Sequence, residues 1–336
     1  MLEWPAMFSG EKVVVGIVTL VAVAVAALCL RWWLALAPSR PLEERVPQPD
    51  PAGAGAVAQS VDIEGEFQAY DGEPSALTGA WPRFRGAAYD TIATGEVSLA
   101  ESWGDAGPPV LWSLDLGEGY AGPAVSKGRV YLLDYDEQQR ADALRCFSLD
   151  DGREIWRRWY SVRIKRNHGM SRTIPAVSDS FVVTMGPRCH VMCTHAETGR
   201  LFWGLNLQEE FGTEVPFWYT GQCPLIDSST AVIAPGGRAL LAGVDCATGE
   251  ILWETPNPKG WKMSHVSIMP MTLGGRRMWV YSAVGGMTAV AADGPDRGSI
   301  LWETRAWTHS VLAPSPVITP DGKIFLTAGY GAGSMV

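Results

Sequence analysis

A tryptophan recurs at nearly constant spacing along the chain, and this feature restricts the possible folds more than any other. The residues concerned are Trp112, Trp156, Trp203, Trp253 and Trp302, at intervals of 44, 47, 50 and 49 residues. The last four each follow a glycine-containing turn and a short apolar segment, whereas Trp112 lacks the preceding turn. Glycine is favoured there because a tight hairpin requires a positive φ. The pattern predicts a repeated hairpin whose second strand ends on a large aromatic side chain.

Each repeat also contains further short apolar segments upstream of the turn. They include residues 129–133, 181–185, 230–234, 278–281 and 323–327, and shorter ones at residues 122–125, 174–177, 223–226 and 314–317. A unit of about 45–50 residues with three or four short strands has the size of one β-propeller blade. A helical repeat would place apolar residues at a period of about 3.6, and these segments do not. We therefore predict an all-β fold, a β-propeller of four-stranded blades.

The repeat resembles the tryptophan-docking motif of the quinoprotein-like β-propellers. This superfamily includes the pyrroloquinoline quinone (PQQ) dehydrogenases and the barrel-assembly-machinery lipoprotein of the outer membrane. Residues 81–86 (WPRFRG) are similar to the first motif of PQQ-binding-like β-propeller repeat proteins, with further matches at residues 117–120, 172–177 and 327–331. The resemblance covers residues 81–336 and implies that the five repeated tryptophans dock between neighbouring blades.

The number of repeats is smaller than the resemblance implies. Four units are complete, and a fifth begins near Pro314. Propellers of this family usually have seven or eight blades, and an open ring exposes sheet edges. We therefore expect a propeller that is incomplete at the C-terminus, with the segment near Trp112 completing the last blade of a longer protein. The alternative is a small propeller, since four blades are possible.

The N-terminal region predicts a membrane anchor. Residues 13–30 contain no charge and no proline, and about 18 helical residues span about 27 Å, close to a bilayer core. We predict a tail at residues 1–12, a transmembrane helix at 13–36, and a Pro/Gly-rich linker and extended segment at 37–80. A cleaved signal peptide is the alternative, but Pro38 directly follows the cleavage-like sequence and should hinder cutting.

Two arguments about the orientation of this anchor conflict. Lys12 precedes the apolar segment, whereas Arg31, Arg40 and Arg45 follow it. The excess of positive charge on cytoplasmic loops therefore favours a propeller in the cytoplasm. The family resemblance implies a periplasmic or other extracytoplasmic propeller, and this is the placement we expect.

Charge and cysteine spacing exclude two classes of function. Asp and Glu number 36 against 27 Lys and Arg, a net charge of −9, which argues against nucleic-acid binding. The one basic stretch, residues 157–166, is interpreted as a solvated rim. Cys189 and Cys193 would lie about 13 Å apart along a strand, too far to share one zinc or one disulfide. We therefore expect buried thiols and no metal site.

The candidate ligand or partner surface comprises His168, Arg172 and Trp218. These residues precede innermost strands, and loops at that end of a propeller open onto its axial channel. An alternative role for Arg172 is to brace neighbouring blades by donating to carbonyl oxygens.

A dehydrogenase of this superfamily would imply PQQ, calcium bound by carboxylate and amide oxygens, a catalytic Asp and often a pair of adjacent cysteines. No two cysteines are adjacent here, and the acidic residues lie mostly in turns. We predict a membrane-anchored, non-catalytic binding or scaffolding propeller with protein partners and no cofactor. The alternative is a PQQ-dependent dehydrogenase whose missing C-terminal blades complete the active site.

Overall fold

The computed structural model describes residues 10–36, 61–94, 100–105, 107–165 and 170–336. The chain divides into two units, Met1–Ala56 and Val57–Val336. The first contains helix α1 (Gly10–Leu36). Its segment Val13–Ala35 has a mean hydropathy of 3.0 and is long and apolar enough to cross a membrane. A signal sequence near the N-terminus meets the same criteria of length and composition.

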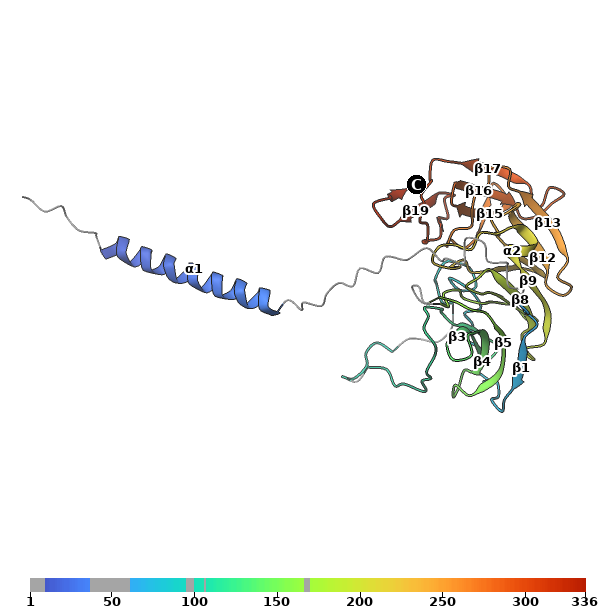
Figure 1. The fold of residues 1–336 in the computed structure, drawn as a ribbon, viewed down its shortest axis with the longest axis horizontal. Coiled ribbons are helices and arrows are strands. Elements are labelled where there is room, and N and C mark those ends of the chain that lie inside the picture. The colour runs from blue at the N-terminus through green and yellow to red at the C-terminus, as the bar shows by residue number, and fades with distance from the viewer. Residues whose placement is uncertain (1–9, 37–60, 95–99, 106, 166–169) are drawn as a thin grey trace, which may run out of the picture. The chain divides into compact units, whose positions relative to one another are not determined.

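The second unit consists of five antiparallel sheets that follow one another along the chain, which we call blades 1 to 5 (Figure 1). Blade 1 contains β1 (Glu66–Ala69), β2 (Ala124–Ser126), β3 (Arg129–Asp136), β4 (Ala141–Ser148) and β5 (Glu154–Ser161). Blade 2 contains β6 (Ala176–Val177), β7 (Phe181–Met185), β8 (His190–His195) and β9 (Leu201–Asn206), followed by the short helix α2 (Leu207–Phe211).

The remaining blades repeat this pattern. Blade 3 contains β10 (Leu225–Asp227), β11 (Thr230–Ile233), β12 (Ala239–Asp245) and β13 (Ile251–Pro256). Blade 4 contains β14 (Met269–Leu273), β15 (Arg276–Ala283), β16 (Gly286–Ala291) and β17 (Ile300–Thr304), and blade 5 contains β18 (Val317–Ile318), β19 (Ile324–Ala328) and β20 (Gly333–Met335). The predicted all-β fold of four-stranded blades is confirmed, because blades 1 to 4 each contain four consecutive antiparallel strands.

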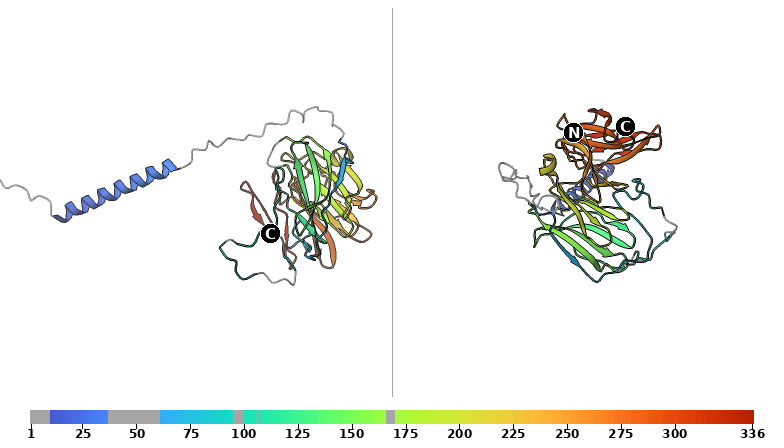
Figure 2. Two further views of the ribbon diagram at one scale, coloured as in Figure 1. Left: turned by 90° about the horizontal axis from the view of Figure 1, so that it is seen from below. Right: turned by 90° about the vertical axis from the view of Figure 1, so that its right-hand side faces the viewer.

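The innermost strands are β2, β6, β10, β14 and β18, and in blade 1 the additional strand β1 pairs at the outer edge, beside β5. Strand β6 contacts both β2 and β10, and β14 contacts β18, so the innermost strands of blades 1 to 3, and those of blades 4 and 5, lie beside one another. Within each blade the later strands lie progressively further out (Figure 1 and Figure 2). The third strands are almost fully buried, as in β12 and β16, because blades pack on both of their faces. The core therefore lies between the blades.

The repeated tryptophans lie against the turn glycines of the next repeat. A Cβ built at Gly199 would lie 2.7 Å from the Trp156 ring, and one built at Gly249 would lie 2.8 Å from the Trp203 ring. Equivalent pairs are Trp112 with Gly152 and Trp253 with Gly298. All four glycines have positive φ, so both the turn and the ring exclude a side chain there. Trp156 and Trp203 are 1% and 9% exposed, whereas Trp112, Trp253 and Trp302 are half-buried.

Residues 61–80, the extended segment after the linker, pack against blade 1. Strand β1 pairs with the outer strand β5, Ile63 is buried, and the Ser75 hydroxyl donates to Asp150 at 2.6 Å. This extended segment therefore belongs to blade 1. Residues 37–60 lie outside the described part of the chain. Around Trp112, residues 107–117 form no strand, although the Trp112 indole N–H donates to Leu149 O at 3.0 Å.

The WPRFRG segment joins the innermost strands of several blades. Trp81 exchanges backbone hydrogen bonds with Val125 of β2, and the carbonyl of Pro82 accepts from the amide of Val177 in β6. The Arg85 guanidinium donates to the carbonyls of Ser315 and Pro316, at 2.9 and 2.8 Å, directly before β18. Residues 81–86 therefore brace blades 1, 2 and 5 near the axis.

Candidate functional site

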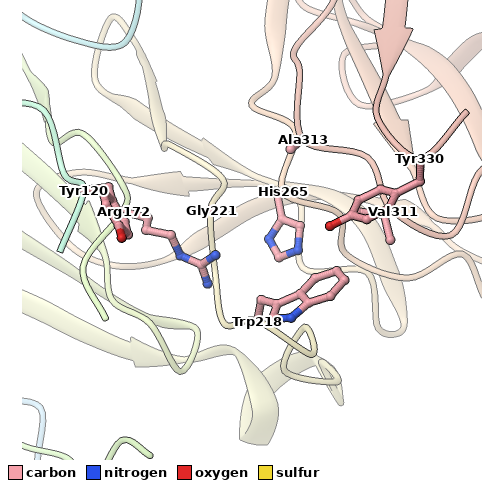
Figure 3. Close-up of a pocket in the computed structure, with 8 residues that line it drawn as sticks. All are labelled: Tyr120, Arg172, Trp218, Gly221, His265, Val311, Ala313 and Tyr330. Carbon is pink, nitrogen blue, oxygen red and sulfur yellow. The ribbon is translucent and has the colours of Figure 1, made fainter. Parts of the chain in front are cut away.

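A cavity of about 460 Å³ opens where the chain enters the innermost strands. Its lining residues are Tyr120, Arg172, Trp218, Gly221, His265, Val311, Ala313 and Tyr330 (Figure 3). Five of them each lie four residues before the innermost strand of a blade, namely Tyr120, Arg172, Gly221, His265 and Ala313. The cavity is therefore built from one equivalent position in five successive repeats, which places it at the axial end of the blades.

The polar side chains of this cavity converge. Figure 3 shows the Arg172 guanidinium reaching in from one side and Tyr330 from the other, with His265 and Trp218 between them. The rings of Trp218 and His265 have centroids 6.3 Å apart and are tilted by 41°. A Cβ at Gly221 would lie 3.0 Å from the Cβ of His265. Glycine at position 221 therefore leaves room for the imidazole.

Arg172 is the only cationic side chain among the eight lining residues. Its Nε and Nη2 atoms are buried and have no hydrogen-bond partner within the described residues. Burial lowers the pKa of the guanidinium, because removing the cation from water disfavours its charged form. Arg172 therefore presents two unused N–H donors at the cavity.

His265 is uncharged at neutral pH. Burial lowers its pKa to about 4, and the nearby Arg172 cation acts in the same direction, against a hydrogen bond with the backbone of Tyr219. Its Nδ1 atom is buried without a partner in the described structure. The cavity thus combines one cation, one neutral imidazole and the aromatic walls of Trp218, Tyr120 and Tyr330.

These residues do not fit the calcium site that the family resemblance implies. Calcium takes about six to eight oxygen ligands, mainly carboxylates and carbonyls. None of the eight lining residues is Asp, Glu, Asn or Gln, and Arg172 would repel a divalent cation. Across the described residues, no group of three or more His, Cys, Asp or Glu side chains could hold a metal ion.

The structure brings Arg172 and Trp218 together, whereas His168 lies outside the described residues. Tyr120 and His265 were not predicted as site residues, although Tyr120 ends the matched segment 117–120. The usable signal was the equivalent position, since both stand four residues before an innermost strand, as Arg172 does. Arg172 makes no bracing hydrogen bond through its Nε or Nη2 atoms within the described part of the chain.

Two other sequence features have structural roles. Cys189 and Cys193 are fully buried, and burial raises the pKa of the Cys189 thiol to about 12. In the basic stretch, Arg158 is buried and donates to the carbonyls of Gly199 and Glu64, at 3.0 and 2.7 Å. The interpretation of this stretch as a solvated rim is therefore wrong at Arg158, because its guanidinium connects β5 to blade 2.

The comparison with protein families gives one match. The family model described as outer membrane protein assembly factor BamB matches residues 140–335. No curated protein sequence matches the chain.

Solved structures with a similar fold include quinohemoprotein alcohol dehydrogenase from Comamonas testosteroni, at 15% identity and a TM-score of 0.49, over 74% of this chain and 46% of that one. BamB from Moraxella catarrhalis has 14% identity and a TM-score of 0.40, over 64% and 57% of the two chains. A europium-containing methanol dehydrogenase has 12% identity and a TM-score of 0.41, over 62% and 47%. The matched region thus spans about half the length of these proteins.

Proposed function

Because this chain belongs to the family described as outer membrane protein assembly factor BamB, we propose that it is a non-catalytic binding module, anchored by α1 with its propeller outside the cytoplasm. Its axial cavity receives a carboxylate group of a protein partner. The family match and the apolar α1 support the placement, and the cavity supports the ligand chemistry.

The observation that carries this proposal is the state of Arg172. A guanidinium with two buried and unused N–H donors is costly unless an acceptor approaches it. A carboxylate is the acceptor that suits it, because its two oxygens accept parallel hydrogen bonds from the guanidinium. Because His265 is neutral, Arg172 is the cation among the lining residues that attracts an anion, and Trp218 supplies an apolar wall.

The rim of the cavity suits a protein partner. Tyr120 and Tyr330 are 74% and 86% exposed, and exposed tyrosines beside an arginine are enriched at the centres of protein interfaces. The partner would cover these rings while its carboxylate enters the cavity.

The test uses benzoate and its neutral counterpart benzamide as probes of the full chain in detergent micelles. We expect benzoate to bind in the millimolar range, typical of a fragment of this size, and benzamide about tenfold more weakly, because only benzoate pairs with Arg172. Arg172→Met should remove the preference. The matched control is Arg305→Met at an exposed arginine. Equal binding of both probes to the unchanged protein would contradict the proposal.

A PQQ-dependent dehydrogenase is the second candidate, and the observation that favours it is a flat indole beside a cation, Trp218 with Arg172. Adding PQQ and calcium to the same preparation and measuring dye-linked alcohol oxidation tests it. Turnover that is lost in Arg172→Met would favour the enzyme over the binding module. Protease accessibility in spheroplasts tests the placement, which requires that the propeller be cleaved from outside.

A further inference from the structure

Two buried thiols meet across the interface between blades 2 and 3. Cys193 lies in β8, and Cys246 directly follows β12. Both are 0% exposed. The Cys193 thiol donates to the Cys246 carbonyl oxygen at 3.2 Å. The sulfur of Cys193 therefore lies against the backbone of Cys246, in the neighbouring blade.

We propose that Cys193 and Cys246 form a disulfide that joins blades 2 and 3. Rotation of the two side chains exchanges the present S–H···O contact for a bond between the sulfurs. The backbone at Cys246 is held against blade 2, because the Trp203 indole N–H donates to the same Cys246 carbonyl at 3.0 Å. A disulfide requires nearby, well-placed backbones, and this contact holds the two strands together.

The repeat shows why this pair stands out. The residue opposite each repeated tryptophan on the third strand is Cys146, Cys193, Gly243 or Ala289 in blades 1 to 4. The residue directly after the third strand is Ala196, Cys246 or Ala292 in blades 2 to 4. By this register Cys146 faces Ala196, Cys193 faces Cys246, and Gly243 faces Ala292. Among these three interfaces, one has a cysteine on both sides.

The chemistry is a two-electron oxidation. Two S–H bonds break, one S–S bond forms, and two protons and two electrons leave. The electrons reduce the disulfide of a thiol–disulfide oxidoreductase to its dithiol, as occurs in oxidising compartments outside the cytoplasm. The neighbouring Cys246 and, to a smaller extent, burial raise the pKa of the Cys193 thiol, so thiolate attack is suppressed once the blades have packed. The bond therefore forms during folding, while the thiols are still accessible.

The first experiment counts thiols in the full chain, isolated from membranes without reductant and unfolded in the presence of a maleimide. We expect two of the six cysteines to escape labelling, all six to react after reduction, and a non-reduced digest to contain one peptide linking Cys193 to Cys246. Reduction of the folded protein should lower its unfolding midpoint by about 5–10 °C.

Two variants make the pairing specific. Cys146→Ala should leave the linkage intact, because its register partner is alanine. Ala196→Cys should create a second linkage, to Cys146, since it copies the geometry of the blade 2 and 3 interface at blades 1 and 2. Both variants retain the wild-type pair, so the result does not depend on a variant that lacks it.

Refolding with oxidised glutathione tests the cysteine pairing independently of where the propeller lies in the cell. A Cys193–Cys246 bond that forms on refolding but is absent from the membrane preparation supports the pairing and contradicts an oxidising location. Six reactive thiols under both conditions, or a linkage that uses Cys189 or Cys223 instead, would overturn the proposal.

Discussion

Blades 3 and 5 are two copies of one sequence repeat, but their strands are buried to different extents. In blade 3, β11 is buried throughout and β12 is buried except at its last residue. In blade 5, Leu326 is the one buried residue of the three strands, among the residues the structure describes. Pairing within the sheet is present in both. The difference shows that burial in this fold is supplied by neighbouring blades and not by the sheet itself.

The repeated tryptophans are among the contacts between neighbouring blades. Blade 3 receives Trp203 at Gly249 and places its own Trp253 against Gly298 of blade 4. Residues 317–335 of blade 5 contain no tryptophan. Substitutions at blade interfaces should therefore have much larger effects on stability than equivalent substitutions in or beside blade 5.

The largest effect is expected for Trp203→Ala. The indole is buried, contacts Gly249 and donates to Cys246 O, and removal of a packed tryptophan typically costs about 3–5 kcal/mol of unfolding free energy. Trp302→Ala, at a half-buried ring, should cost about half as much. Guanidinium unfolding of the full chain in detergent, followed by circular dichroism, measures both. Equal losses for the two variants would contradict the comparison.

The next effect depends on pH and concerns Asp142 at the interface of blades 1 and 2. Its carboxylate accepts from the Tyr160 hydroxyl at 2.8 Å, and both groups lie where a Cβ of Gly186 would be. Burial raises the pKa of Asp142 from 3.8 to about 7, against the effect of the Tyr160 hydrogen bond. Because the pKa of Asp142 is higher in the folded protein, the contribution of its protonated form to the free energy of unfolding is complete below pH 3.8. That contribution is lost as the pH rises through 7.

Asp142→Asn should therefore stabilise the protein more at pH 8 than at pH 5, by about 3 kcal/mol. Two buried histidines with lowered pKa, His190 and His265, change stability in the opposite direction between pH 4 and 6.5. Their contributions are the same in variant and wild type, so they cancel when the two proteins are compared at each pH. The control is Asp321→Asn in blade 5, where Lys323 lowers the pKa of an exposed carboxyl. That contribution is constant between pH 5 and 8, so the control should show no such difference.

Two glycines with the same backbone conformation allow the cost of the tryptophan contact to be measured separately from the cost of backbone strain. Gly249 and Gly331 both have φ of +78°, but only Gly249 faces a ring, since nothing lies within 4 Å of a Cβ at Gly331. Gly331→Ala should cost about 1–2 kcal/mol from the left-handed backbone alone. Gly249→Ala should cost at least about 1 kcal/mol more, because Trp203 must also move. Indistinguishable unfolding midpoints would show that the ring does not restrict this turn.

The sequence predicted the features that recur and missed those that do not. The turn glycines, the tryptophans and the buried strands repeat, and the blades were predicted from them. Strand β1 was missed because its four residues are all exposed and carry no alternating pattern. It is held through backbone pairing with β5, which no side-chain pattern reports.

The candidate site was predicted in part for a related reason. Arg172 and Trp218 were recognised as residues preceding innermost strands, and the structure brings them to one cavity. His265 and Tyr120 come from other blades, and their meeting depends on how far each blade turns from the last. Sequence spacing alone does not give that angle. The shared offset of four residues would have identified both once the first strands were aligned.

The smallest effect is expected for an ion pair at the surface of the interface between blades 3 and 4. Arg277 of blade 4 donates to both carboxylate oxygens of Asp227 in blade 3, at 3.1 Å each. The Arg277 side chain is 49% exposed, so water and ions weaken the pair, and exposed pairs are typically worth about 0–1 kcal/mol. Arg277→Ala should therefore lower the unfolding free energy by no more than this, and raising the salt to about 1 M should remove the difference by screening. The same salt should leave the loss in Trp203→Ala unchanged, because an apolar contact is not screened. An Arg277→Ala loss that equals that of Trp203→Ala and persists in high salt would mean that charge, rather than the docked indole, holds neighbouring blades together.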